Sequence, residues 1–135
     1  MALSNLDTAK RFYELVNTDP TQLPEVLDAD IQWEIVKGFP YGGKYNGLNS
    51  VFEDFFGRVM QHFEFWKAEP HDYIVAGDEI VVLGTYHTKA KVAGQDVYSD
   101  FVHIWSVSDG KLKRLRQVAD TVQLSRALNH EVPVS

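Results

Sequence analysis

The side chain best suited to chemistry in this sequence is His103, which lies in an alternating polar and apolar stretch, residues 95–107. An imidazole has an unperturbed pKa of about 6.5, so it can accept or donate a proton near neutral pH. We therefore predict His103 as the catalytic acid or base of a candidate site. The alternative interpretation is a buried histidine satisfied by a neighbouring tyrosine or carbonyl group.

Gln117 is the second polar side chain of the candidate site that contains His103, and it lies in another alternating stretch, residues 111–119. Leu115, Gln117 and Ala119 form the more apolar of the two alternating sets there, so we expect this set to face inward. An amide can orient a carbonyl or hydroxyl group by hydrogen bonds, but it cannot act as a general base at ordinary pH. Gln117 is therefore predicted to bind a substrate.

Other kinds of reactive group are missing from the sequence. It has no cysteine, which excludes disulfides and thiolate chemistry, and its histidines and acids show no metal-ligand spacing. Gly42-Gly43-Lys44 lacks the spacing of a phosphate-binding loop. We predict neither a metal nor a cofactor.

The composition of the chain limits the classes of partner that the protein is expected to bind. The 135 residues fit one domain, and a net charge of −6 would repel a phosphate backbone, so we expect no nucleic acid partner. No apolar run reaches the roughly 18–20 residues of a membrane span and no signal peptide is evident, which predicts a cytoplasmic protein without a membrane partner. Aromatic residues make up 13% of the chain. Because such residues line apolar pockets, we expect a small apolar or aromatic ligand.

The hydrophobic pattern predicts helices first and strands after them. Helical spacing covers residues 4–17, capped by Ser4, then 21–27 and 48–63. Alternation predicts strands at 31–35, 63–75, 79–92, 95–107 and 111–119. A closing helix begins at Asp120 and Thr121, and a loose tail follows at 129–135. The long loop 37–47 carries Tyr41 and Tyr45, which form either a lid or a packed loop.

A two-residue hairpin at Ala93-Gly94 sets the register of the two strands beside it. It places Tyr86 opposite Phe101 and Gly84 opposite His103, where the glycine would leave room for a ligand. Side chains alternate between faces, and the more aromatic face is predicted to be the inner one. With the first helix and first strand added, the predicted ligand-binding residues are Phe12, Tyr13, Trp33, Tyr86, Phe101, Trp105, Leu115 and Gln117.

The order of elements indicates an α+β fold, and several short motifs are similar to those of a known family. These are Asp30-Ile-Gln-Trp33 in the first strand, Gly47 before the third helix, and Asp109-Gly110-Lys111-Leu112 followed by Asp120. Over residues 4–128 the chain resembles the SnoaL-like family of the nuclear transport factor 2-like superfamily, which includes polyketide cyclases and ketosteroid isomerase-like proteins. The resemblance implies a cone-shaped, curved antiparallel sheet wrapped around three N-terminal helices, with a short C-terminal helix.

The resemblance also implies catalytic roles at certain positions, and this sequence has the family's residue at only some of them. His103 matches the family's inward histidine, whereas Gln117 stands where the polyketide cyclases carry a catalytic aspartate. At the isomerase base position the chain has Ile35, and the isomerase tyrosine matches Phe12, with Tyr13 adjacent. An epoxide hydrolase of this fold would need paired aspartates, for which only Asp100, expected on the outer face, and Asp120, expected to cap a helix, are available.

We therefore expect a protein that binds a small, largely apolar, oxygenated molecule in the cone, as an isomerase, cyclase or hydrolase-type enzyme using His103. The alternatives are a non-catalytic binding protein and a homodimerisation module of the same fold. The outer sheet face carries Val102, Ile104 and Val118, so we also expect a homodimer through that face.

Overall fold

The computed structural model describes residues 4–92 and 94–128. The predicted tail at 129–135 and Ala93 of the predicted hairpin lie outside these residues. In chain order the elements are α1 (Asn5–Thr18), η1 (Pro20–Glu25), β1 (Leu27–Ile35), β2 (Gly43–Asn46), α2 (Leu48–Ser50), η2 (Val51–Phe56), α3 (Gly57–Val59), η3 (Met60–His62), β3 (Phe63–Ala76), β4 (Glu79–Ala90), β5 (Asp96–Ser108), β6 (Lys111–Ala119) and α4 (Thr121–Ala127).

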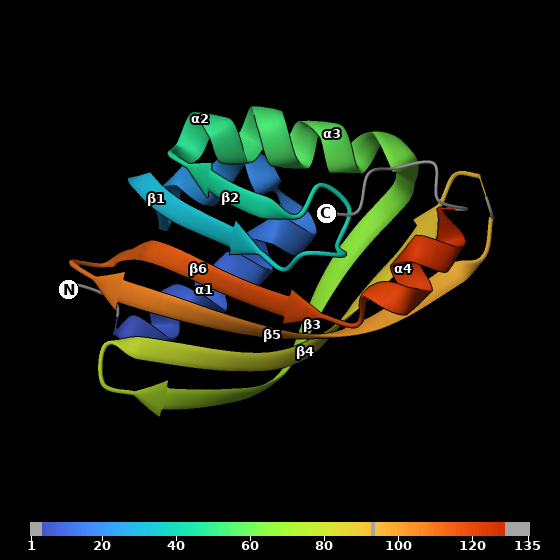
Figure 1. Ribbon diagram of the computed structural model, residues 1–135. Helices are drawn as coiled ribbons and strands as arrows, with labels where there is room; N and C mark the ends of the chain where they lie inside the picture. The colour runs from blue at the N-terminus through green and yellow to red at the C-terminus, as the bar shows by residue number, and fades with distance from the viewer. Residues whose placement is uncertain (1–3, 93, 129–135) are drawn as a thin grey trace.

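The strands form one six-stranded sheet in the order β2-β1-β6-β5-β4-β3. Figure 1 shows this sheet curving around α1 and the helical segment that runs from α2 to η3. The α+β fold class is confirmed. One pair differs from the expected antiparallel arrangement, because β1 and β6 run parallel. Parallel strands need a long connection between them, and here four strands (β2, β3, β4 and β5) and the helical segment provide it.

The first helix begins and packs as its sequence predicts. The Ser4 hydroxyl accepts a hydrogen bond from the Asp7 backbone N–H at 3.0 Å, which confirms the N-cap. Ala9, Phe12 and Tyr13 are buried at helical spacing, so one face of α1 lies against the sheet. This packing brings Phe12 and Tyr13 toward the interior of the cone.

The predicted helix 48–63 is a continuous helical segment that changes geometry along its length. Val51–Phe56 is π-helical and Met60–His62 is a 3₁₀ turn. A π segment holds an extra residue per turn, which rotates the following side chains around the axis, and such segments are frequent at functional sites. Periodicity alone did not predict it, because apolar residues at positions 51, 52, 55, 56, 59 and 60 suit an ordinary helix equally well.

The loop predicted at 37–47 contains a short strand, β2, which pairs with β1. The Tyr41 hydroxyl lies 3.0 Å from His62 Nε2, and the Tyr45 hydroxyl donates to the Tyr41 carbonyl. Both tyrosines are half-buried. Of the two interpretations offered for this segment, the structure therefore shows the packed loop.

The register of β4 and β5 corrects the predicted hairpin. Gly84 lies opposite Phe101 and His103 lies opposite Val82, two residues away from the predicted pairing. Strand β4 ends at Ala90 and strand β5 begins at Asp96, so the connection between them is longer than a two-residue turn. Since the shift is an even number, every side chain keeps its predicted face.

Gly84 does not leave room for a ligand opposite His103, as the sequence had suggested. A side chain at this position would overlap the Phe101 ring and the Glu69 carbonyl. Phe101 therefore fills the space above the glycine, which is a packing role.

The last helix, α4, starts at the residue that the sequence indicates. The Asp120 carboxylate accepts a hydrogen bond from the Val122 backbone N–H at 3.2 Å, so Asp120 is the N-cap. None of the helices in the described residues is both long enough and apolar enough to cross a membrane.

Candidate functional site

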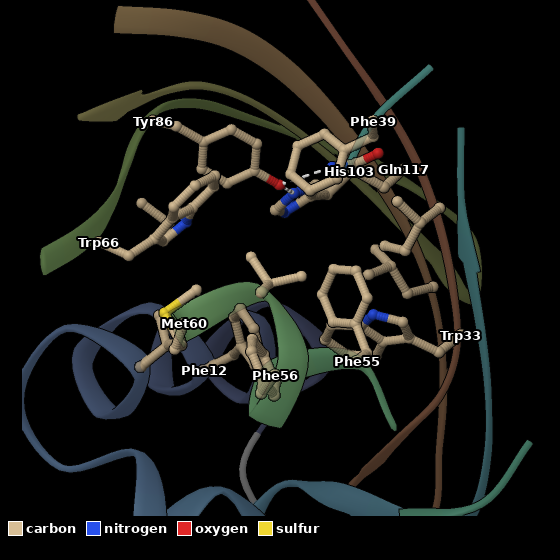
Figure 2. A pocket seen from close by; sticks show the side chains of 15 residues that line it. Phe12, Trp33, Phe39, Phe55, Phe56, Met60, Trp66, Tyr86, His103 and Gln117 are labelled. Carbon is tan, nitrogen blue, oxygen red and sulfur yellow. Dashed lines mark hydrogen bonds between the residues drawn. The ribbon is translucent and has the colours of Figure 1, made fainter. Parts of the chain in front are cut away.

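A cavity of about 40 Å³ lies between the inner face of the sheet, α1 and the helical segment. Figure 2 shows His103, Tyr86 and Gln117 at one end of it, with Phe12, Phe56 and other apolar side chains opposite. No acidic residue, lysine or arginine lines the cavity among the described residues. The lining residues are Phe12, Val16, Trp33, Ile35, Phe39, Phe55, Phe56, Val59, Met60, Trp66, Ala68, Tyr86, His103, Leu115 and Gln117.

The predicted site residues divide into those that line the cavity and those that support it. Phe12, Trp33, Tyr86, His103, Leu115 and Gln117 line it. Tyr13, Phe101 and Trp105 are buried beside His103 but are not part of the cavity wall. The structure therefore brings all the predicted residues into one region, while placing three of them behind its surface.

His103 is held by two tyrosines. Its Nδ1 lies 2.7 Å from the Tyr13 hydroxyl and its Nε2 lies 2.6 Å from the Tyr86 hydroxyl. Complete burial lowers the pKa of His103 to about 3, because the imidazolium would lose its hydration. The ring is therefore neutral near pH 7, and both its nitrogens are engaged, as in the alternative interpretation of a satisfied buried histidine.

Two N–H groups extend this network beyond the tyrosines. Trp105 Nε1 donates to the Tyr13 hydroxyl at 3.0 Å, and Gln117 Nε2 donates to the Tyr86 hydroxyl at 3.0 Å. Burial raises the pKa of both tyrosines, so both phenols keep their hydrogens. The five side chains form a chain of uncharged groups in the order Trp105, Tyr13, His103, Tyr86 and Gln117, and the last three line the cavity.

Strand register places Gln117 beside His103, because these two residues are direct partners across β5 and β6. The Gln117 Oε1 atom accepts a hydrogen bond from the Val36 backbone N–H at 3.3 Å, and that N–H also bonds to the Gln117 carbonyl. The amide is thus held from both ends. It can donate a hydrogen bond, but it supplies no base.

The Phe101 ring stacks on His103, with ring centroids 4.0 Å apart and an interplanar angle of 20°. This contact and the two tyrosine hydrogen bonds fix the orientation of the imidazole. Trp33 presents a different feature, since its Nε1 atom is buried without a hydrogen-bond partner in the described residues.

The two aspartates considered for epoxide hydrolysis do not reach the cavity. The Asp100 carboxylate is exposed and accepts a hydrogen bond from Thr85, and Asp120 caps α4. Among residues 4–92 and 94–128, no three histidine, aspartate or glutamate side chains gather in a manner that could hold a metal ion.

Several wall residues were not predicted. Phe39 comes from the loop before β2, Trp66 from β3 and Val16 from the end of α1. Phe55, Phe56 and Met60 of the helical segment line the cavity as well. The alternation in 63–75 was the available signal for Trp66, but β3 shifts its register near Phe63.

A second apolar hollow lies next to the cavity. It measures about 270 Å³ and includes Pro20 and Phe52. It shares Val16, Phe56, Met60 and Trp66 with the inner cavity. These four side chains, which we call the inner wall, separate the two spaces, so their movement would join them.

A model of the SnoaL-like domain matches residues 9–115. No curated protein matches the chain.

Among solved structures, an NTF2-like protein of unknown function from Burkholderia pseudomallei is similar, with 27% identity and a TM-score of 0.84, covering 93% of this chain and 98% of that one. TerC co-crystallised with polyporic acid has 25% identity and a TM-score of 0.82, covering 93% and 98%. IdmH of Streptomyces antibioticus, a candidate polyketide cyclase, has 16% identity and a TM-score of 0.79, covering 94% and 99%, which is a likeness of fold alone.

Proposed function

Because this chain belongs to the SnoaL-like domain family, we propose that it binds a small, neutral, largely apolar molecule carrying an oxygen atom, in the cavity of its curved sheet. The observation that carries the proposal is the Tyr86–His103–Gln117 group, which forms the polar end of an otherwise apolar space. A few polar groups in an apolar cavity orient a ligand and select it. The absence of lining charges in the described residues favours a neutral ligand.

The size of the cavity adds a requirement for entry. About 40 Å³ holds water-sized molecules, so a larger ligand must displace the inner wall and join the cavity to the adjacent hollow of about 270 Å³. Met60 is the most adaptable member of that wall, since its side chain is unbranched. TerC, which is 25% identical over almost the whole chain, was co-crystallised with polyporic acid, so this acid is included as a probe beside the neutral compounds.

Acid–base catalysis on the bound molecule is the second candidate function. It is favoured by the continuous hydrogen-bond chain from Tyr13 through His103 to Tyr86, which ends at the cavity. A hydroxyl at the end of such a chain can stabilise negative charge that develops on a substrate oxygen. His103 would then act through Tyr86, since neither of its nitrogens is free to meet a substrate.

A thermal-shift screen tests the proposal. The ligands are polyporic acid and sets of polycyclic aromatic, steroid, terpenoid and fatty-acid compounds, measured on the wild type and on Tyr86→Phe. The matched control is Tyr98→Phe, because Tyr98 is 59% exposed and lies outside the cavity. A ligand that binds the folded state raises its melting temperature by mass action.

We expect a shift in the wild type and in Tyr98→Phe that is smaller in Tyr86→Phe. No shift with any compound, or an equal shift in all three proteins, would contradict the proposed site. Mass spectrometry of the bound compound then separates the two candidates: a new product supports catalysis, and unchanged ligand supports a binding protein.

A further inference from the structure

The network around His103 contains one more hydrogen than its own acceptors can take. Two of its bonds have a fixed direction, because Trp105 Nε1 and the Gln117 amide nitrogen can only donate. Reversing the Gln117 amide would direct its N–H₂ group at the Val36 N–H, so the orientation of the amide is also fixed. Each tyrosine oxygen therefore already accepts one hydrogen bond.

The neutral His103 ring then divides the two tyrosines into a donor and an acceptor. It has one N–H group and one bare nitrogen, and each nitrogen meets one phenol. One tyrosine must donate to the bare nitrogen, and the other must accept from the N–H group. The accepting tyrosine takes two hydrogen bonds, and its own hydroxyl hydrogen has no partner left inside the network.

The two places for this spare hydrogen differ in their surroundings. Tyr13 is only 2% exposed and does not line the cavity, and within the described residues its hydroxyl forms hydrogen bonds only with His103 and Trp105. A spare hydrogen there would be buried without an acceptor, which is unfavourable. Tyr86 lines the cavity, whose volume of about 40 Å³ exceeds the roughly 10–15 Å³ that one water needs, so its hydrogen can reach an acceptor there.

We infer that His103 carries its hydrogen on Nε2, that Tyr13 donates to Nδ1, and that Tyr86 directs its hydroxyl hydrogen into the cavity, which makes the site selective for ligands with a carbonyl-type acceptor oxygen. The ligand part of this inference rests on the proposed function. In this arrangement Tyr13 and His103 are positioning residues, and Tyr86 is the group that meets the ligand.

The remaining polar groups of the wall reinforce the selectivity. Trp33 Nε1–H, which is buried and has no hydrogen-bond partner among the residues that the structure describes, is also a donor and adds no acceptor. The acceptor atoms already accept hydrogen bonds within the protein. Gln117 Oε1 accepts from the Val36 N–H, His103 Nδ1 accepts from Tyr13, and the Tyr86 oxygen accepts from His103 and Gln117. A ketone oxygen finds donors here. The hydroxyl hydrogen of the matching alcohol finds no acceptor and would be buried unsatisfied.

The histidine tautomer is tested without any ligand. Nitrogen NMR of ¹⁵N-labelled protein reports which ring nitrogen carries the hydrogen, and the His103 signals are those that disappear in His103→Gln. We expect hydrogen on Nε2 and a bare Nδ1. Hydrogen on Nδ1 would overturn the inference whatever the protein binds.

The ligand preference is tested with 1-indanone and 1-indanol, which differ at one oxygen, by ligand-observed NMR titration. We expect the wild type and Tyr98→Phe to bind the ketone about tenfold more tightly than the alcohol. In Tyr86→Phe this preference should fall to about twofold or less, because the hydroxyl donor is gone. Equal affinities in the wild type would overturn the inferred selectivity and leave the proposed function standing. Binding of neither compound would count against both, while the tautomer measurement would still decide the hydrogen positions.

Discussion

Tyr86 Oη lies 2.6 Å from His103 Nε2, at the polar end of the cavity. Tyr86 comes from β4 and His103 from β5, and a hydrogen bond from Gln117 on β6 reaches the same hydroxyl. Three neighbouring strands thus converge on one oxygen atom. This arrangement makes Tyr86 the residue through which the buried network meets anything in the cavity.

Removing the Tyr86 hydroxyl should destabilise the fold as well as weaken binding. In Tyr86→Phe both His103 Nε2 and the Gln117 amide lose a partner in a buried site. We expect the free energy of unfolding to fall by about 1–3 kcal/mol, measured by urea denaturation. Tyr98→Phe should change it by less than about 0.5 kcal/mol, since Tyr98 is exposed. A loss of the same size in both variants would contradict the role given to the Tyr86 hydroxyl.

The low pKa of His103 predicts how stability depends on pH. In the unfolded chain the imidazole binds a proton below about pH 6.5, whereas in the folded protein its pKa is about 3. Between these values the unfolded state holds more protons, so His103 makes stability fall as pH decreases, by up to about 1.4 kcal/mol per pH unit.

The measurement compares unfolding free energies of the wild type and His103→Gln from pH 7 to pH 4. The wild type should lose more stability on acidification than the variant, because only the wild type has this group. Equal losses in the two proteins would contradict a neutral His103. A His103 ring signal that titrates near pH 6.5 in the folded protein would contradict it directly.

Opening the inner wall should help larger ligands to enter. Met60 contacts both the cavity and the neighbouring hollow, so Met60→Ala joins the two spaces. We expect faster association of 1-indanone in stopped-flow measurements, with a loss of about 1–2 kcal/mol in stability because Met60 is half-buried. The adjacent exposed Gln61→Ala is the control. An unchanged association rate in Met60→Ala would show that ligands enter by another route.

The outer face of the sheet supports a proposal about assembly. Val118 is 51% exposed, and Val102 and Ile104 lie on the same face of the sheet. We propose a homodimer through this face, as the sequence predicts. Light scattering after size-exclusion chromatography should give twice the chain mass of 15.4 kDa, and Val118→Lys should give the monomer mass. A monomeric wild type would overturn the proposal.

The sequence predicted the elements better than their contacts. Strand alternation is a local signal, so 63–75 and 111–119 differ from β3 and β6 by one residue at most. The β4–β5 register depends on the length of the connection, which local patterns do not specify, and the prediction was wrong by two residues. Because that error was even, His103 and Tyr86 were still placed on the correct face.

The site was predicted in its residues but not in its geometry. Tyr13 and His103 are 90 positions apart, and no local pattern indicates that their side chains meet. The sequence did offer a buried histidine satisfied by tyrosine as one interpretation, and the structure shows two such tyrosines. Phe39 and Trp66 were missed because their place in the wall depends on how the loop before β2 and the bulged strand β3 fold back over the cavity.

The central claim is that Tyr86 binds the oxygen of a neutral ligand in this cavity, and calorimetric titration with 1-indanone tests it most directly. We predict saturable binding of one molecule per chain to the wild type, with affinity reduced about tenfold in Tyr86→Phe and unchanged in Tyr98→Phe. Equal affinity in the wild type and Tyr86→Phe, or no binding to the wild type, would contradict the claim.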